Sequence, residues 1–140
     1  MKTLAQLIEL YYQSVGRGAN LLLNVPPNRD GLLGAEDIVS LKAFGDWRRK
    51  TFGKAAVSAA GPDIDAARPV TFSVIRLRED IRQGQRIESV VVEAWRDGWQ
   101  AIGSATSVGP RRLIRLETPV TTARVRARST GGPVSELALF

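Results

Sequence analysis

The sequence predicts an α+β chain in which a helix–strand–helix unit precedes an antiparallel β-sandwich. Residues 1–53 contain two segments with helical spacing of apolar residues, one on either side of a short apolar run. Residues 70–140 contain six short segments of strand character that are separated by turn residues. A chain of 140 residues is about one domain's worth and is long enough to bury one core.

Two helices are predicted in the first unit. The first covers residues 3–15, whose apolar face carries Leu4, Leu7, Ile8, Tyr11 and Val15. Residues 16–18 (GRG) end it, because glycine tolerates the left-handed conformation of a helix C-cap. The second helix covers residues 35–51, with Glu36 and Asp37 near its start and basic residues near its end, an order that the helix dipole favours.

A buried strand is predicted between these helices. Residues 20–25 (NLLLNV) form a continuous apolar run that is typical of a strand covered on both faces, as in parallel sheets. Pro26 and Pro27 end it, and residues 28–31 read as a turn. Because one strand cannot form a parallel sheet by itself, this unit is expected to be incomplete.

The remaining chain is predicted to be a linker followed by strands. Residues 54–69, rich in small residues, glycine and proline, are interpreted as the linker. The strand segments are residues 70–78, 86–95, 99–104, 112–116, 121–129 and 136–140. Asp97-Gly98 between Trp95 and Trp99 is a strong hairpin signal, and regular short strands of this kind favour a sandwich.

The composition excludes several kinds of chemistry. The absence of cysteine excludes disulfides, thiolate metal sites and a cysteine nucleophile. The absence of histidine excludes Ser-His-Asp catalysis and the commonest ligand of transition metals. The net charge of +6 is spread thinly without a nucleic-acid motif, so no nucleic-acid partner is expected. No apolar run approaches the roughly 18 residues of a membrane span, so no membrane span is expected. The N-terminal residues lack a signal-peptide pattern, so no signal peptide is expected on this chain.

Trp95 and Trp99 are the candidate ligand-binding residues. Exposed indole faces stack on sugar rings, so the pair forms a conceivable glycan platform. The alternative is packing in the core, since tryptophan is mostly buried on average.

Other polar residues are better explained by structure than by chemistry. Asp30, Glu36 and Asp37 follow the apolar run, where a barrel would place catalytic carboxylates, but turn and helix-start roles account for them. Asn20 and Asn24 flank that run, where they could border a substrate pocket or satisfy buried backbone groups.

Two groups of arginines are candidate binding sites. The first group lies at a predicted strand end and could bind sugar hydroxyls, but its acidic neighbours favour a salt-bridged surface. It consists of Arg76, Arg78, Arg82 and Arg86 with Glu79 and Asp80. The second forms a possible phosphate stripe, although the solvated face of a sandwich explains it better: Arg124, Arg126 and Arg128 with Arg111, Arg112 and Arg115.

Two blocks of sequence carry a family resemblance. One is SVGRGANLLLNVPP at residues 14–27, followed by RDG at 29–31. The other starts with LREDIRQGQRIE at residues 77–88, continues through EAW and GW of the tryptophan hairpin and extends to VR at 125–126. In order and content they resemble the end of the catalytic barrel and the C-terminal sandwich of α-L-fucosidases of glycoside hydrolase family 29.

This resemblance implies both architecture and activity. Residues 1–53 would be the last helix–strand–helix part of a (β/α)8 barrel. Residues 70–140 would be a galactose-binding-like, jelly-roll-like sandwich that lacks its first strands and has an unpaired edge. The family hydrolyses terminal α-L-fucosyl bonds with retention and needs no cofactor. Its catalytic carboxylates and histidines lie in barrel residues without a counterpart here, so no catalytic residue is assigned and the chain alone is expected to be inactive.

Two other functions remain open from the sequence. A standalone carbohydrate-binding module would bind fucosylated or galactosylated glycans through Trp95 and Trp99. A fragment completed by a partner would cover its apolar run with a separate barrel chain or with a second copy of itself.

Overall fold

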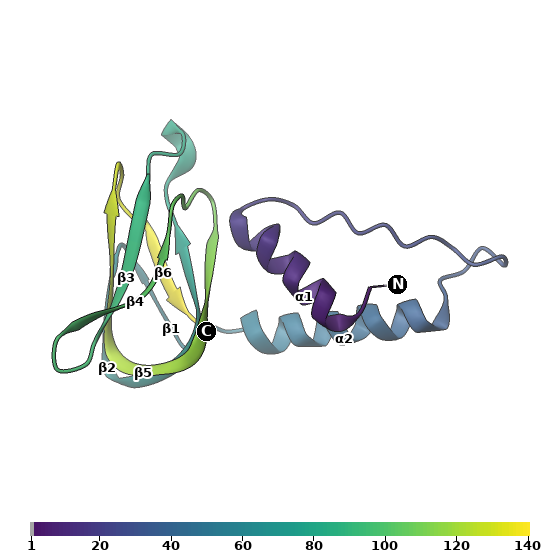
Figure 1. Cartoon of the computed structure of the whole chain (residues 1–140), viewed down its shortest axis with the longest axis horizontal. Helices are drawn as coiled ribbons and strands as arrows, with labels where there is room; N and C mark the ends of the chain where they lie inside the picture. Colours follow the sequence, from purple (N-terminus) through teal and green to yellow (C-terminus); the bar gives the residue numbers. More distant parts are fainter. Residues whose placement is uncertain (1) are drawn as a thin grey trace.

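The computed structural model describes residues 2–140, which form a helix pair beside a β-sandwich (Figure 1). The helices are α1 (Leu4–Gln13), α2 (Ala35–Phe52) and the short 3-10 turns η1 (Val15–Arg17) and η2 (Ile81–Gln83). The strands are β1 (Val57–Ala60), β2 (Asp63–Arg78), β3 (Ser89–Trp95), β4 (Trp99–Ala105), β5 (Arg112–Thr130) and β6 (Glu136–Leu139). None of the helices in the described residues is long and apolar enough to cross a membrane.

Both predicted helices are confirmed to within two residues at each end. Thr3 caps α1 in a capping box: its hydroxyl accepts the Gln6 backbone N–H at 3.3 Å, and the Gln6 side chain accepts the Thr3 N–H at 2.9 Å. Gly18 then takes a positive φ of 83°, as expected for the residue that ends this helical region.

The strand predicted at residues 20–25 is wrong. Residues 18–28 carry no regular secondary structure, and the Leu22 side chain is 95% exposed. Figure 1 shows this segment running alongside the helices without a neighbouring strand. The physical reason is that an extended segment becomes a strand only by hydrogen bonding to another, and no described residue offers that partner.

The linker predicted at residues 54–69 is also wrong. It contains β1 and the first part of β2, joined by a turn in which Gly61 has a φ of 90°. β1 pairs antiparallel with β6, and Ile64 of β2 is buried in the core. These strands were not predictable from residue type, because alanine and serine have weak strand propensity. They form strands here through pairing and burial.

The predicted antiparallel sandwich is confirmed, as a single six-stranded sheet folded over on itself. The strand order is β1-β6-β2-β5-β3-β4, so β1 and β4 form its edges. The predicted strands at 112–116 and 121–129 are one strand, β5, which pairs with β2 along most of its length. This ribbon has register shifts between Asp65 and Val70 and between Phe72 and Val74, and Figure 1 shows both strands curving. β2 and β5 therefore serve both layers of the sandwich, which explains lengths well above the usual five or six residues.

The core of the sandwich lies between these layers. It is formed by apolar side chains that alternate along the strands, among them Phe72, Ile75, Leu77, Val90, Val92, Val125, Leu137 and Leu139. Phe72 is the largest fully buried side chain. This burial stabilises the sandwich through the hydrophobic effect and close packing.

An aromatic cluster joins the helix pair to the sandwich. Phe52 at the end of α2 lies 5.5 Å from the Tyr11 ring, 5.7 Å from the Trp47 ring and 5.3 Å from the Phe140 ring, measured between centroids. Val74 and Leu113 of the sandwich pack into the same cluster. α2 has no fully buried residue, so this cluster, rather than a core of its own, holds it in place.

Glu79 holds two loops at one end of the sandwich. Its carboxylate is 6% exposed and accepts three backbone N–H groups, from Arg86 at 2.9 Å, Ile87 at 3.1 Å and Gly109 at 2.7 Å. Burial raises the pKa of Glu79, but the three N–H donors outweigh it and hold the pKa below its ordinary 4.5. A neutral carboxyl would lose much of this bonding, so the loops depend on the charge.

Replacing Glu79 by Gln is expected to lower the free energy of unfolding at neutral pH by about 1–3 kcal/mol, because buried donors lose a charged acceptor. A native pKa below 4.5 means that the unfolded chain takes up protons first as the pH falls. The stability that the Glu79 carboxylate contributes is therefore fully present above the unfolded pKa and is lost as the pH falls through the native pKa. Urea unfolding at several pH values measures both effects.

The matched control for this experiment is Asp80→Asn. Hydrogen bonds from Arg82 lower the pKa of Asp80 to about 2, but Asp80 is solvent-exposed. Its substitution should change the neutral-pH stability much less than Glu79→Gln does, because solvent screens an exposed ion pair. If Glu79→Gln keeps both the wild-type stability and the wild-type pH slope, the assigned role of Glu79 is wrong.

Candidate functional site

The predicted tryptophan hairpin is confirmed, and it brings the two candidate residues together. Trp95 and Trp99 are direct cross-strand partners of β3 and β4, with ring centroids 5.5 Å apart in an edge-to-face arrangement. Asp97 and Gly98 take φ values of 56° and 141° in the turn, and the Arg96 N–H donates to the Gly98 carbonyl at 2.8 Å. Three residues separate the paired tryptophans, and positive φ at two of them lets the chain reverse direction between β3 and β4.

Two arginines of β5 lie over these indole rings. The Arg126 guanidinium is 4.1 Å from the Trp99 ring centroid, and that of Arg124 is 5.2 Å and 5.3 Å from the Trp95 and Trp99 centroids. Arg126 also donates to Glu93 at 2.6 Å. The tryptophans lie outside the core, with Trp95 40% exposed and Trp99 half-buried. Packing in the core is therefore not their role.

A shallow hollow of about 410 Å³ adjoins the hairpin. Its walls include Trp95, Arg96, Asp97, Thr121 and Arg124. The buried Thr122 hydroxyl donates to the Trp95 carbonyl at 2.9 Å and accepts the Arg124 backbone N–H at 3.2 Å, so it links the hairpin to β5. Aromatic, guanidinium and hydroxyl groups in one hollow are suited to a polar ligand with flat apolar faces, such as a sugar.

The carboxylates considered from the sequence do not assemble into a catalytic pair. Asp30 lies in a turn whose Asn28 side chain accepts the Asp30 and Leu32 backbone N–H groups at 2.9 Å and 3.0 Å. Glu36 and Asp37 occupy the first turn of α2, where negative charge suits the helix dipole. The turn and helix-start interpretation of these residues is thus supported, and none of them lines a described hollow.

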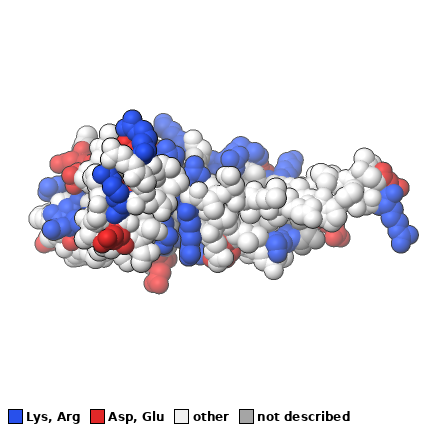
Figure 2. Space-filling model, turned by 90° about the horizontal axis from the view of Figure 1, so that it is seen from above, with Lys and Arg blue, Asp and Glu red and all other residues white. Residues whose placement is uncertain are grey.

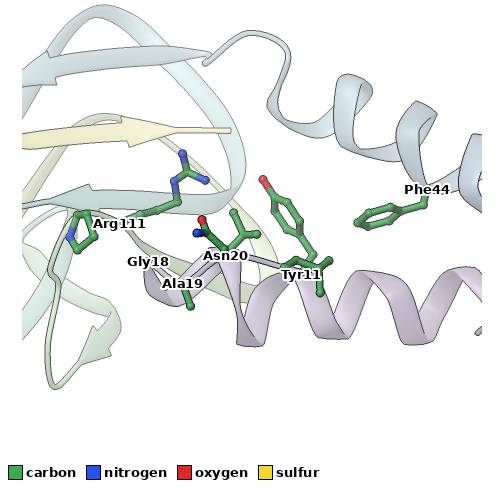
Figure 3. Close-up of a pocket in the computed structure, with 9 residues that line it drawn as sticks. Tyr11, Gly18, Ala19, Asn20, Phe44 and Arg111 are labelled. Atoms are coloured by element: carbon green, nitrogen blue, oxygen red, sulfur yellow. The ribbon is translucent and has the colours of Figure 1, made fainter. Parts of the chain in front are cut away.

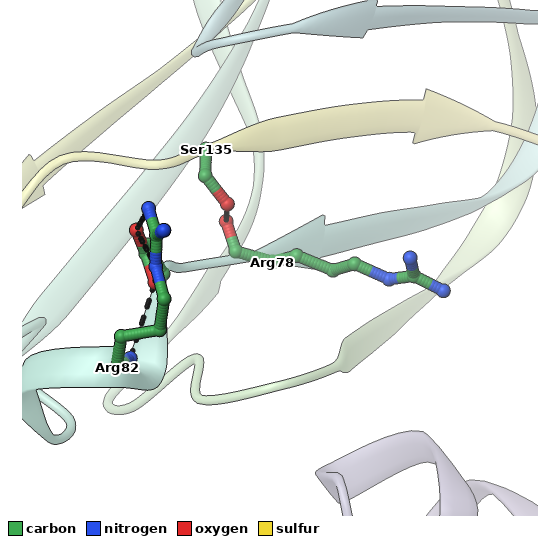
Figure 4. A network of polar contacts seen from close by, with 4 residues as sticks. Arg78, Arg82 and Ser135 are labelled. Atoms are coloured by element: carbon green, nitrogen blue, oxygen red, sulfur yellow. Dashed lines mark hydrogen bonds and ion pairs between the residues drawn. The ribbon is translucent and has the colours of Figure 1, made fainter.

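The first group of arginines forms a salt-bridged strand end, as the sequence favoured. Glu136 binds Arg76 at 2.6 Å and Arg78 at 3.4 Å. Asp80 binds Arg82, and the Ser135 hydroxyl donates to the Arg78 carbonyl at 3.0 Å (Figure 4). These ion pairs favour a structural role for this strand end over a sugar site.

The second group of arginines does not form a single stripe. Arg124 and Arg126 cover the tryptophans, whereas Arg115, near the other end of β5, donates to Glu9 of α1 at 2.9 Å and lies over the Tyr12 ring. Because β5 bends, arginines that share a strand lie in different layers, so spacing along the sequence did not indicate one surface.

A second hollow, of about 510 Å³, lies between the helix pair and the sandwich (Figure 3). Its lining residues include Tyr11, Asn20, Phe44 and Arg111. Figure 3 shows the Tyr11 hydroxyl and the Arg111 guanidinium pointing into the space between the helices and the sandwich. Asn20 is thus beside a hollow, while Asn24 is exposed on the extended segment. The helical spacing of Tyr11 indicates only a core residue, so its position beside a hollow was not predictable from the sequence.

No set of three metal-ligating side chains occurs among residues 2–140. Glu79, which the sequence placed in a surface charge cluster, is instead a buried acceptor for backbone groups. No sequence pattern distinguishes these two environments, because the loops that cover Glu79 come from residues 86–109.

Comparison with known proteins supports one family. A family model described as Alpha-L-fucosidase matches residues 1–52. "Alpha-L-fucosidase 1" of Arabidopsis thaliana is 32% identical over 82% of this chain and 31% of its own length. The chain spans about a third of the length of the curated relatives it matches.

Solved structures agree over almost the whole chain. The crystal structure of SpGH29 matches with a TM-score of 0.87 and 32% identity, over 99% of this chain and 39% of that one. A glycoside hydrolase 29 family member from an unknown rumen bacterium matches with a TM-score of 0.87 and 30% identity, over 99% of this chain and 28% of that one. The chain therefore belongs to the α-L-fucosidases of glycoside hydrolase family 29 and corresponds to the C-terminal part of its members.

Proposed function

We propose that these residues serve a retaining α-L-fucosidase as its C-terminal, non-catalytic part. The observation that carries the proposal is the extended apolar segment at residues 20–25, which has an almost fully exposed Leu22 and no strand beside it. Such a segment gains stability only when other strands supply hydrogen bonds and cover its apolar side chains. Family membership indicates that a barrel would supply them.

The chemistry of the described hollows supports a non-catalytic role. Retaining glycosidases use two carboxyl groups about 5–5.5 Å apart. None of the four hollows has more than one carboxylate among its lining residues. The hydrolytic groups would therefore belong to barrel residues outside these 140.

The purified protein is expected to release no nitrophenol from 4-nitrophenyl α-L-fucoside above a protein-free blank. The physical reason is that no acid and nucleophile pair faces a common hollow. Asp30→Asn serves as the matched variant, because Asp30 is the carboxylate nearest along the chain to the predicted barrel edge. If the wild-type protein releases nitrophenol and the Asp30→Asn variant does not, the proposal is overturned.

We further propose that the apolar segment is completed by another polypeptide, either a separate barrel or a second copy of the chain. Leu32, Leu33, Ile38 and Val39, which follow this segment along the chain, are also exposed. This stretch of the chain therefore leaves several large apolar side chains uncovered, a feature that marks an interaction site in soluble proteins.

The Leu22→Asp variant is expected to remain a monomer at concentrations where the wild type self-associates, because a carboxylate cannot be buried in an apolar contact without a large cost. Its thermal midpoint should match that of the wild type, since Leu22 buries almost nothing within the chain. Size-exclusion chromatography with light scattering measures the mass. Ile81→Asp, which changes an exposed apolar residue of the sandwich, should leave self-association intact. A wild-type protein that is monomeric and binds no apolar dye would contradict completion by a partner.

A second candidate function is glycan binding at the tryptophan hairpin. The specific observation that favours it is that both tryptophans lie outside the core. Trp95 lines a hollow with guanidinium and hydroxyl groups, and Trp99 packs edge-to-face against Trp95. We propose fucosylated or galactosylated glycans as the ligands. The sugar would stack against indole surface while Arg96 or Arg124 donates to its hydroxyls.

The Trp95→Ala variant is expected to lose binding to such glycans by about tenfold or more, which corresponds to ~1.4 kcal/mol of lost contact. Binding is measured on a glycan array and by titration with the strongest ligand. Trp47→Phe is the control, because Trp47 belongs to the aromatic junction and not to the hairpin. The absence of wild-type binding to every fucosylated and galactosylated glycan would count against this function.

A further inference from the structure

A third hollow, at the junction of the helix pair and the sandwich, is bordered by four arginines. Its volume is about 290 Å³, and it lies between the end of α2, the last turn of α1 and the sandwich. Its lining residues are Tyr11, Arg48, Arg49, Phe52, Gly53, Arg76 and Arg111. No aspartate or glutamate is among them. Figure 2 shows several basic side chains over the region where the sandwich meets the helices.

The positive charge around this hollow is only partly neutralised. Arg49 pairs with Asp46 at 2.5 Å and Arg76 pairs with Glu136 at 2.6 Å. Neither Arg48 nor Arg111 forms a salt bridge with a carboxylate of the described residues. Four guanidinium groups therefore face two carboxylates, and the surplus is about two positive charges.

Arg111 is the least satisfied of the four. It is half-buried, and its Nε atom is buried without a hydrogen-bond acceptor. The Nε atom of Arg76 is in the same state. An unpaired donor on a charged group is costly to bury, so a native structure that keeps two of them beside one hollow needs an explanation.

The hollow also offers a neutral donor and apolar walls. Tyr11 lines this hollow together with Arg111, and both residues also line the larger hollow of Figure 3. Phe52 forms a wall and excludes water on that side. The carbonyl groups at the C-terminal end of α2 repel an anion, but together they carry a negative charge of only about half a unit. The surplus positive charge of the arginines is larger.

We propose that this arginine hollow binds a tetrahedral oxyanion, a sulfate or phosphate group that is either free or esterified to a sugar. Guanidinium groups present paired N–H donors that match the oxygen spacing of such groups, and a charge-assisted hydrogen bond is about twice as strong as a neutral one. The anion would accept hydrogen bonds from the Arg111 and Arg48 guanidinium groups and from the Tyr11 hydroxyl. It would also neutralise the surplus positive charge. This inference does not depend on the proposed fucosidase role or on glycan binding at the hairpin.

The test compares thermal unfolding of the full chain in sodium sulfate and in sodium chloride at equal, low ionic strength. Sulfate at ten times its Kd should raise the wild-type Tm by about 4 °C. Arg111→Gln should show no sulfate-specific rise, and its Tm in chloride should equal or exceed that of the wild type, because the substitution removes an unpaired buried donor and a like-charge repulsion. Arg128→Gln, an exposed position of β5 outside the hollow, removes the same charge and should keep the wild-type response.

Isothermal titration with inorganic sulfate, inorganic phosphate and galactose 6-sulfate separates the two sources of the group. Tighter binding of the sulfated sugar than of inorganic sulfate supports the ester form, and the reverse order supports the free anion. Arg48→Gln, on the exposed end of α2, gives a second reading if Arg111→Gln fails to fold. An equal sulfate response in the wild type and in both hollow variants, or no binding of any of the three ligands, overturns the proposal.

Discussion

The docking of the helix pair depends on one aromatic contact surface. Phe52, Tyr11 and Trp47 from the helices meet Phe140 at the end of the chain, and Val74 and Leu113 complete the contact. Arg76 lies over the Phe140 ring at 5.1 Å, which ties this cluster to a salt bridge of the sandwich. Because α2 buries no residue completely, the free energy that holds it comes mostly from these partly buried rings. The position of every hollow at the junction follows from this contact.

The folded-over sheet separates two chemical environments. The bend of β2 and β5 places the tryptophan hairpin on the side of the sandwich away from the helices, while Arg111 and Arg76 remain at the junction (Figure 1). Aromatic and guanidinium groups occur in both places but are arranged differently. At the hairpin the guanidiniums lie over indole faces, and at the junction they surround a hollow. The two surfaces are therefore suited to different ligands, a glycan at the first and an oxyanion at the second.

The candidate site could be predicted only in part. The Trp95–Trp99 pair was predictable because Asp97-Gly98 is a local hairpin signal that sets the register of its own flanks. The arginines that cover the pair were not, since their contact depends on which strand lies beside β3. Glu79 and Arg111 were missed for a related reason: burial of a charged side chain is decided by segments distant in the chain, and these two occur in sequence patterns typical of exposed residues.

The sequence by itself determined the elements whose signals are local. Both helices, the hairpin, the α+β class and the resemblance to family 29 fucosidases were all readable from spacing, capping residues and motifs. Tertiary structure decided what depends on partners. Alanine- and serine-rich residues became β1 because β6 lies beside them. The strongly apolar residues 20–25 did not become a strand, because no other strand of the described residues lies beside them. The physical reason is that a helix satisfies its backbone hydrogen bonds within itself, while a strand can satisfy them only with another segment.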